Sequence, residues 1–444
     1  MPIQKRGKCF DEEERCFSKE EALKEAKRCK LCKDAPCEKG SPLGLPIIKL
    51  VEHIRSDKLD KAYAIVKEVN PFPKTSSKII DAYQCSEKAC KLESPIQIRR
   101  LQNYVTEHGK APSEEKVKKI KKHIGIVGSG PAGLSCAAEL SKKGYEVTVY
   151  EALAKQGGHL TISVPSYKLP RNVYAEEIAA LNNVHFQNNV VVGKTIHLKE
   201  LKNKHDAIFL ALGVNTPQIF PFPGIEKGNV FTGHDLLMRL NHFKAHEGYD
   251  TPLKIGKNVV VLGGSELAVD TARSLRRLGA NVSIIFEHGY NQMQAHHESL
   301  RRAQEENVQF IFLTQVEKLI GNKDVNGIEC IQMMSHTTES GDNVLTPIDG
   351  GSFTIPCDQV YLATSQYPTI FSDPEIKIRK SRTGKPIVNQ HLQTTEDGIF
   401  AGGEMRLGKV SLEETIADGK KGAKKIDLWL QNALKDEDIN DELF

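Results

Sequence analysis

Three cysteines near the start of the chain have the spacing of iron–sulfur ligands. Cys29, Cys32 and Cys37 follow the pattern Cys-x-x-Cys-x-x-x-x-Cys, which lets three thiolates bind one cluster while a fourth ligand comes from elsewhere in the fold. Seven of the ten cysteines precede residue 91, and the chain is much longer than a typical secreted disulfide framework. We therefore expect metal or redox chemistry in the N-terminal region.

A glycine-rich turn after an apolar run predicts a dinucleotide site. Its residues are Gly128, Ser129, Gly130, Pro131, Ala132 and Gly133, and the run before it is 124–127. The first glycine allows a tight turn, the second lets backbone N–H groups approach a pyrophosphate, and the third lets helix and strand pack closely. Glu151 lies 18 residues past Gly133, where a carboxylate can accept both ribose hydroxyl hydrogens.

A second turn 135 residues further on has a weaker form of the same pattern. It comprises Gly263, Gly264, Ser265 and Glu266, with Ala268 at the third small position. Ser265 adds a side chain where backbone must approach phosphate. Glu287 ends the next expected strand, and an acid there favours a free 2'-hydroxyl over a 2'-phosphate, which predicts NADH. The alternative is a packed Rossmann-like unit that holds no nucleotide.

The elements around these motifs change character along the chain. Residues 1 to about 108 show helical spacing, with Ser18 and Glu21 as a capping box, and a linker is expected near 109–113. After it, strand, glycine turn and helix alternate, as in a doubly wound parallel sheet. The net charge of +4 is a weak bias, and the Lys runs lack the aromatic interleaving of nucleic-acid readers. We expect no nucleic-acid partner, no membrane span and a cytoplasmic location, since neither a signal-peptide core nor a long apolar run occurs.

Several further motifs are similar to the glutamate synthase small subunit family and to the flavin and NADPH half of dihydropyrimidine dehydrogenase. The resemblance covers about residues 20–430. It is carried by Gly157-Gly158-His159-Leu160, Val164-Pro165, Lys168-Leu169-Pro170, the stretch 206–213 and Gly402-Gly403-Glu404. It implies FAD at the first turn, NADPH at the second, and a helical N-terminal domain with two 4Fe-4S clusters. The coenzyme it implies thus conflicts with the NADH predicted from Glu287.

The resemblance also implies the fourth ligand of the cluster, and the chain departs from the family at the second cluster. It places the fourth cluster ligand at Cys90, so one complete set remains, whereas the second set would need Ser41, positions near Ile80 and Ser86, and Gln102. Of these only Gln102 matches, with Cys85 one place out of register, which predicts a single 4Fe-4S cluster; zinc on the same four thiolates is the alternative. Further implied flavin-site residues are Gly158, Leu160, Gly213, Gly403, Glu404 (where the family usually has Asp) and Lys168, a cation expected near the flavin ring.

Together these features predict an α/β protein in which an N-terminal helical iron–sulfur domain is followed by two interleaved Rossmann-like nucleotide-binding domains. The expected limits are 1–110 for the iron–sulfur domain, 119–255 with 363–444 for FAD, and 256–362 for NAD(P)H. The predicted enzyme is an FAD-dependent NAD(P)H oxidoreductase that takes hydride from the nicotinamide and passes single electrons through the cluster to a small acceptor, such as a disulfide, ferric iron, a nitro compound or a quinone. Alternatives are the electron-input subunit of a larger complex that serves a redox partner protein, and a flavin-holding module without hydride input. Oligomeric state is left open.

Overall fold

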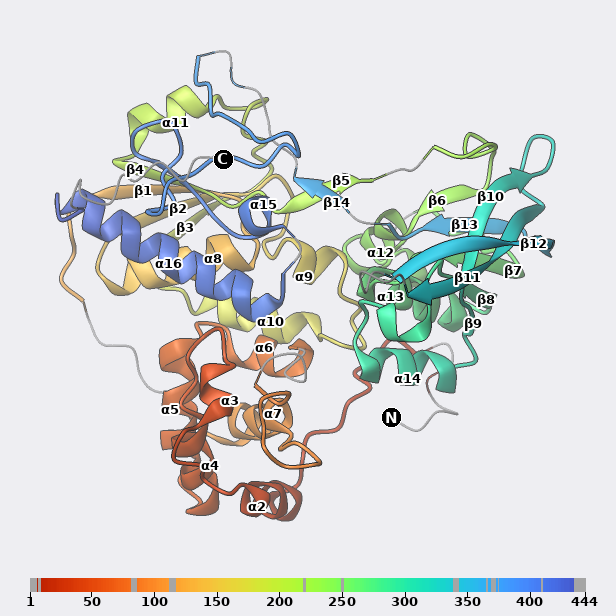
Figure 1. Ribbon diagram of the computed structural model, residues 1–444. Helices are drawn as coiled ribbons and strands as arrows, with labels where there is room; N and C mark the ends of the chain where they lie inside the picture. The colour runs from red at the N-terminus through yellow and green to blue at the C-terminus, as the bar shows by residue number, and fades with distance from the viewer. Residues whose placement is uncertain are drawn as a thin grey trace. The chain divides into compact units, whose positions relative to one another are not determined.

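The computed structural model describes residue 6 and residues 9–80, 86–111, 117–218, 221–248, 251–337, 343–364, 366–368, 373, 375–408 and 410–434. Cys85 and residues 112–113 of the expected linker lie outside these ranges. The chain divides into two compact units (Figure 1). Unit 1 contains residues up to Glu14, Thr161–Lys168 and Pro217–Gln366, and unit 2 contains Arg15–Leu160, Leu169–Thr216 and the chain from Tyr367 onward.

Unit 2 begins with a group of helices. Their buried faces form one core with Leu50, Val51 and Leu101 at its centre. The predicted capping box is present, because Ser18 accepts from the Glu21 N–H group and the Glu21 side chain accepts from the Ser18 N–H group. These helices are α2 (Lys19–Arg28), α3 (Pro36–Lys39), α4 (Ile47–Arg55), α5 (Leu59–Val69), α6 (Pro73–Ile79) and α7 (Ile98–His108).

The rest of unit 2 is built on a parallel five-stranded sheet in the order β15-β4-β1-β2-β3. Side chains of α8 and α16 pack on one face, and side chains of α11 and α15 pack on the other. The elements are β1 (His123–Val127), α8 (Pro131–Lys142), β2 (Glu146–Tyr150), α9 (His159–Ile162), α10 (Arg171–Ala179), β3 (Val184–Gln187), α11 (Leu198–Lys204), β4 (Ala207–Leu210), β15 (Ile399–Ala401), α15 (Glu404–Leu407) and α16 (Leu412–Leu430).

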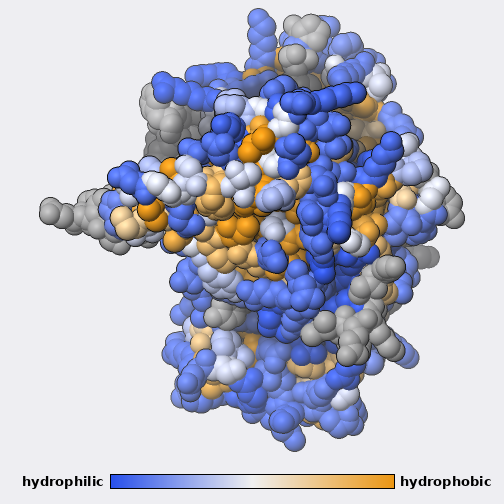
Figure 2. All heavy atoms as spheres, turned by 90° about the vertical axis from the view of Figure 1, so that its right-hand side faces the viewer, coloured by the Kyte–Doolittle hydropathy of each residue, from blue (hydrophilic) through white to orange (hydrophobic). Residues whose placement is uncertain are grey.

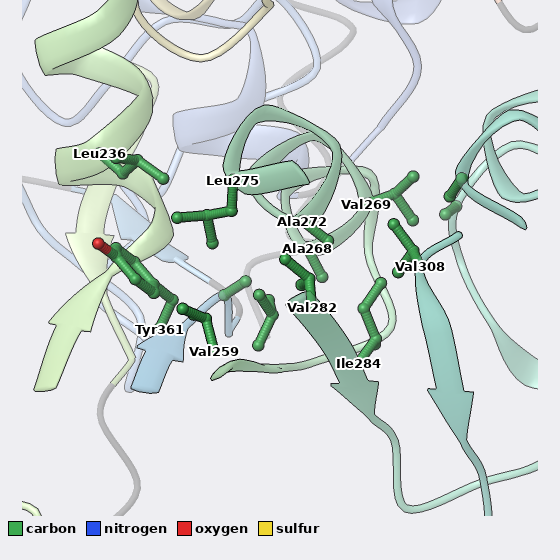
Figure 3. Close-up of a cluster of buried hydrophobic side chains, with 14 of the residues drawn as sticks. Leu236, Val259, Ala268, Val269, Ala272, Leu275, Val282, Ile284, Val308 and Tyr361 are labelled. Atoms are coloured by element: carbon green, nitrogen blue, oxygen red, sulfur yellow. The ribbon is translucent and has the colours of Figure 1, made fainter. Parts of the chain in front are cut away.

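Unit 1 repeats the plan with a parallel sheet in the order β6-β13-β7-β8-β9. Figure 3 shows the core between this sheet and its helices, where Val259, Val282 and Ile284 meet Ala268 and Leu275. An antiparallel sheet, β10-β11-β12, covers the other face. The elements are β6 (Val230–Thr232), α12 (Gly233–Asn241), β7 (Asn258–Leu262), α13 (Glu266–Arg277), β8 (Asn281–Ile285), α14 (His297–Glu305), β9 (Gln309–Ile311), β10 (Thr314–Ile320), β11 (Gly327–Thr337), β12 (Asn343–Pro356) and β13 (Gln359–Leu362), with short 3-10 turns at Ala245–Glu247 and Tyr290–Gln292.

The predicted fold class is confirmed, and the unit borders differ from the expected domain limits. Residues 217–255, expected with the flavin domain, lie in unit 1, because β6 pairs in parallel with β13. Residues 6 and 9–14, expected with the cysteine helices, also lie in unit 1, where Glu13 forms buried ion pairs. The chain passes between the units at β5 (Val214–Pro217) and β14 (Gln366–Pro368), which pair as a two-stranded sheet.

The face shown in Figure 2 is mainly polar, and its largest group of apolar side chains lies near the middle of the view. Large exposed apolar side chains in unit 1 include Met334, Val344 and Ile348, on β11 and β12. Among the described helices, none is both long and apolar enough to cross a membrane.

Candidate functional site

The first glycine turn lies at the point where the strand order of unit 2 reverses. β1 has β2 on one side and β4 on the other, so the turn after β1 opens into the crevice at the carboxyl ends of the strands. Gly128 has φ 100°, and a Cβ there would lie 2.4 Å from the Ala211 carbonyl oxygen. A Cβ on Gly133 would lie 2.0 Å from the Gly128 carbonyl oxygen. Both glycines are therefore required by packing.

Gly130 has a different role in the same turn. It is the N-cap of α8, with Pro131 at the first helical position and Ala132 and Gly133 after it. A Cβ on Gly130 would meet nothing within 4 Å, so open space lies beside this backbone. Open space at a helix N-terminus, where unpaired N–H groups and the helix dipole favour anions, suits a pyrophosphate.

Glu151 follows β2 beside this turn, as the sequence predicts. Its carboxylate is buried and accepts hydrogen bonds from the Ser129 N–H group at 3.0 Å and the Leu153 N–H group at 2.8 Å, and also from the Ser129 hydroxyl. The Ser129 hydroxyl in turn accepts from the Gly157 N–H group at 3.1 Å. This network fixes the carboxylate at the edge of the crevice.

The predicted C-terminal motif reaches the first turn. Gly403 has φ 73°, and a Cβ there would lie 2.7 Å from Ala132 Cβ. The Gly403 N–H group donates to Asp418 of α16 at 2.7 Å, and the Arg406 guanidinium also binds Asp418. Asp418 and Arg406 were not predicted; the one sequence signal is that Asp418 stands two residues before the lysine-rich stretch 420–425.

His159 lies between two residues that are distant in sequence. Its Nε2 is 3.2 Å from Asn215 Oδ1, and its Nδ1 is 3.8 Å from Glu404 Oε2. Glu404 therefore pairs with the Gly-Gly-His-Leu segment. His159 and Asn215 are added to the candidate flavin-site residues. Leu160 is buried, and a Cβ on Gly158 would come within 2.9 Å of Gly130 Cα.

Gly213 follows β4 at the same edge of the sheet. It has φ 67°, and a Cβ there would meet nothing within 4 Å. The neighbouring Leu212 N–H group contacts Met405 Sδ at 3.4 Å. Segments 128–133, 151, 157–160, 212–215 and 402–406 thus lie together at the carboxyl-terminal edge of the unit 2 sheet, which is where a dinucleotide binds in this fold.

The second turn is also formed as predicted, now between β7 and α13. Gly263 has φ 135°, and a Cβ there would lie 2.5 Å from the Ala363 carbonyl oxygen. A Cβ on Gly264 would lie 2.5 Å from the Phe286 ring. Ser265 is the N-cap of α13. Its hydroxyl is 3.4 Å from the Ala363 carbonyl oxygen, so the extra side chain points back to the end of β13.

Glu287 lies just beyond β8, where a ribose-binding acid is expected. Its side chain is 59% exposed, and the His288 Nε2 atom lies 3.5 Å from its carboxylate. The two arginines that could have offset this charge are engaged elsewhere. Arg276 donates to the Glu306 carbonyl oxygen and to Asn281, past the C-terminal end of α13. Arg277 is buried against Glu13 and Glu306, at 2.8 Å from each.

Lys168 belongs to unit 1, where its ammonium group binds two acids of α13. It lies 2.6 Å from Asp270 Oδ1 and also pairs with Glu266 Oε1. A role for Lys168 beside the flavin ring stays a prediction, because the described contacts of its ammonium group are with these carboxylates. Glu266, expected at the nicotinamide site, stands at the first position of α13.

The four predicted cluster ligands meet around one cavity of unit 2. The cavity is lined by Cys29, Cys32, Cys37 and Cys90, and otherwise mainly by apolar side chains such as Ile47 and Leu92. Cys29 caps α2, Cys37 lies on α3, and Cys90 precedes α7.

The loop that carries these thiols is held in an uncommon conformation. Leu31 (φ 49°) and Ala35 (φ 38°) flank Cys32 in the left-handed region although neither is glycine. Residues in this region cost free energy and cluster at ligand sites. The Leu31 N–H group points at Cys29 Sγ, 3.5 Å away, as backbone donors do around cluster thiolates.

The thiol environment fits a cluster. Burial and the nearby Cys29 raise the pKa of the Cys37 thiol to about 11, so a bound cation is needed to hold it as a thiolate at neutral pH. In a 4Fe-4S cluster each of four thiolates binds a different iron, and four cysteines line this cavity.

Cys85 is outside the part of the chain that the structure describes, and the described positions of the second cluster hold no thiol. Ser41 is buried and its hydroxyl accepts from the Leu45 N–H group at 3.2 Å. Ile80, Ser86 and Gln102 are buried as well. The three late cysteines Cys136, Cys330 and Cys357 are buried in the cores of their units.

The fold and site define a two-nucleotide oxidoreductase preceded by an iron–sulfur domain. Residues 122–431 match the pyridine nucleotide-disulphide oxidoreductase family, and residues 6–114 match dihydropyrimidine dehydrogenase domain II, 4Fe-4S cluster. The chain therefore belongs to the pyridine nucleotide-disulphide oxidoreductase family, in the branch of the glutamate synthase small chain that carries this domain. It is an FAD-dependent NAD(P)H oxidoreductase with a 4Fe-4S domain.

Several relatives are similar over most of this chain. The beta subunit of the NADP(+)-dependent formate dehydrogenase of Moorella thermoacetica is 30% identical over 92% of this chain, which spans 62% of that protein. The glutamate synthase [NADPH] small chain of Azospirillum brasilense is 29% identical, with 96% of this chain and 92% of that protein covered. The NAD-dependent dihydropyrimidine dehydrogenase subunit PreT of Escherichia coli K12 is 27% identical, with 96% and 98% covered.

Solved structures show the same fold at lower identity. FprA of Mycobacterium tuberculosis in complex with NADPH aligns with a TM-score of 0.60 at 18% identity, over 70% of this chain and 85% of that one. This similarity supports the two-unit nucleotide-binding fold.

Proposed function

We propose that this protein is an electron-input flavoprotein that oxidises NADH and delivers single electrons through one 4Fe-4S cluster to a redox partner protein. The convergence of Cys29, Cys32, Cys37 and Cys90 on one cavity carries the proposal, because it supplies a one-electron exit next to the dinucleotide fold. When bound, FAD accepts two electrons from a nicotinamide, and a 4Fe-4S cluster carries them singly. The remaining chemistry of the chain is binding and orientation.

Unit 2 supplies the flavin-binding groups. The turn at Gly130 would hold the pyrophosphate, Glu151 the ribose, and the Gly403–Glu404 segment with His159 the ribityl region. Each of these groups is fixed by a packed or hydrogen-bonded neighbour, so the site is preorganised.

A partner protein is favoured over the small acceptor that the sequence first suggested. Two of the similar proteins, from Moorella and Escherichia, are named as subunits, and a third is a small chain. Reduction of a disulfide through a dithiol relay has little support, since Cys136, Cys330 and Cys357 are buried in the cores of their units. The alternative is a reductase that acts alone on another small acceptor, such as ferric iron, a nitro compound or a quinone.

NADH is favoured over NADPH on the geometry of unit 1. Glu287 presents an exposed carboxylate at the end of β8, while Arg276 and Arg277 are bound to other groups. A 2'-phosphate would meet this negative charge, and neither Arg276 nor Arg277 could offset it without leaving its present partners. PreT, named NAD-dependent, shows that the relatives include both coenzyme types.

Metal and flavin analysis of anaerobically purified protein tests the proposal. We expect about four irons per FAD, whereas about eight irons, or zinc in place of iron, would contradict the single cluster. Anaerobic addition of NADH should bleach the flavin absorption, and failure with both NADH and NADPH would leave only a flavin-binding module. Isolation of the native protein with a larger partner distinguishes the input subunit from a reductase that acts alone on a small acceptor.

A further inference from the structure

A cluster of three charged side chains lies at the N-terminal end of α13 in unit 1. Glu266 and Asp270 are four residues apart on this helix, so they share one face. Lys168 binds both carboxylates, at 2.6 Å from Asp270 Oδ1. The Lys168 side chain is only 15% exposed and that of Asp270 is 5% exposed.

The acid at the helix start has further donors. Glu266 Oε2 accepts from the His296 N–H group at 2.9 Å, and Oε1 accepts from the Ser299 hydroxyl. Both donors belong to the first turn of α14, whose N-cap is His296. The carboxylate of Glu266 is thus held in place between two helix N-termini.

Lys168 is itself fixed by its neighbour in the chain. The Tyr167 ring is fully buried below the guanidinium groups of Arg273 and Arg277, at 4.9 and 3.8 Å from its centroid. The Tyr167 carbonyl oxygen accepts from the Glu13 N–H group at 3.0 Å. The ammonium group of Lys168 is therefore presented to α13 by a rigid segment.

This arrangement has an electrostatic consequence for nucleotide binding. The N-terminus of α13 is where a dinucleotide pyrophosphate binds in this fold. A carboxylate at the first helical position repels that anion and competes for the same helix dipole. Lys168 offsets the charge, leaving the three side chains with one net negative charge in place of two.

We propose that Lys168 is a positioning residue of the nicotinamide site: it offsets one of the two negative charges of Glu266 and Asp270, so that α13 can accept the dinucleotide pyrophosphate. This inference rests on the proposed function in that unit 1 must bind NADH. Lys168 then acts at the nicotinamide turn, and its substitution should leave the flavin midpoint potential unchanged.

The test is the affinity of the oxidised, FAD-loaded protein for NAD⁺, measured by calorimetry at low salt. Lys168→Met should weaken binding at least tenfold, and the effect should shrink at high salt because screening weakens the repulsion. Lys168→Met with Glu266→Gln should restore affinity to within about threefold of the unmodified protein. Lys318→Met removes a lysine paired with Glu329 on the antiparallel sheet of the same unit, and should leave the affinity unchanged.

The flavin midpoint potential separates the two possible roles of the lysine. An unchanged potential in Lys168→Met, together with weakened NAD⁺ binding, supports the proposal. A shifted potential with unchanged binding would overturn it. If Lys168→Met does not fold, Glu266→Gln alone should bind NAD⁺ more tightly, and unchanged affinity would count against the proposal. Failure of the unmodified protein to bind either coenzyme would instead overturn the proposed function.

Discussion

Glu13 and Arg277 form a buried ion pair, with Arg277 Nη2 at 2.8 Å from Glu13 Oε2, although the two residues are 264 positions apart. Arg273 and Arg302 also bind the Glu13 carboxylate, and Glu306 pairs with both Arg273 and Arg277. The residues that precede the cysteine helices are therefore part of unit 1. Removing them would take one of two carboxylate partners, Glu13, from the buried guanidinium groups of Arg273 and Arg277.

The Glu13 cluster predicts a pH dependence of stability. Burial raises the pKa of Glu13, but Arg273 and Arg302 outweigh it and lower the pKa from 4.5 to about 2. A depressed pKa stabilises the folded state above pH 4.5, and this contribution is lost as the pH falls from 4.5 to about 2. The full loss corresponds to about 3 kcal/mol in the free energy of unfolding.

Hydrogen exchange of α13 amides, measured from pH 6 down to about pH 2.5, reports this contribution locally. Glu13→Gln should lower the protection of α13 at pH 6 by about 3 kcal/mol and remove the pH-dependent part that comes from this carboxyl. Glu12→Gln, an exposed acid in the same segment, is the matched control and should behave as the unmodified protein. Equal protection in both variants at pH 6 would contradict the role of Glu13.

The sequence was sufficient for motifs that lie within one short segment. The turn at Gly128, the acid Glu151 and the cysteines from Cys29 to Cys37 occupy local patterns with a fixed relation to strand and helix. Contacts between distant segments had no such pattern. Each unit is built from segments that are far apart in the sequence. Three pairings therefore depend on the tertiary fold: His159 with Glu404, Lys168 with Glu266, and Glu13 with Arg277.

Alanine substitutions at the first two glycines of the flavin turn, Gly128 and Gly130, should have different effects. Gly130→Ala adds a methyl group to open space at normal φ, so we expect a change in the stability of the flavin-free protein below about 1 kcal/mol and at least tenfold weaker FAD binding. Gly128→Ala forces a Cβ to within 2.4 Å of the Ala211 carbonyl oxygen at φ 100° and should cost at least about 2 kcal/mol. Thermal unfolding and flavin titration distinguish the two effects. Unchanged FAD affinity in Gly130→Ala would show that the pyrophosphate does not approach this backbone.

Substitution of a cluster ligand should remove iron, whereas substitution of another cysteine in the same unit should not. Cys37→Ser should reduce bound iron from about four to near zero per FAD, because a hydroxyl is a poor substitute for a thiolate ligand. Cys16→Ser is the matched control: its thiol faces His108 Nε2 at 4.0 Å and burial raises its pKa to about 11. Iron analysis and the visible absorption of the cluster give the result. Iron loss in Cys16→Ser alone would mean that the ligand assignment is wrong.

The choice of coenzyme should depend on the charge at the end of β8. Glu287→Arg replaces an exposed carboxylate, 59% accessible, with a group able to bind a 2'-phosphate in a bidentate manner. The ratio of kcat/KM for NADPH to that for NADH should rise at least tenfold, equivalent to about 1.4 kcal/mol in differential transition-state binding. Glu317→Arg makes the same charge change at an exposed position of β10 and should leave the ratio unaltered, which separates a local contact from a general effect of net charge. If both variants shift the ratio equally, long-range charge accounts for the preference; if neither does, Glu287 has no part in it. A rise confined to Glu287→Arg would identify the acid after β8 as the residue that sets this enzyme apart from its NADPH-dependent relatives.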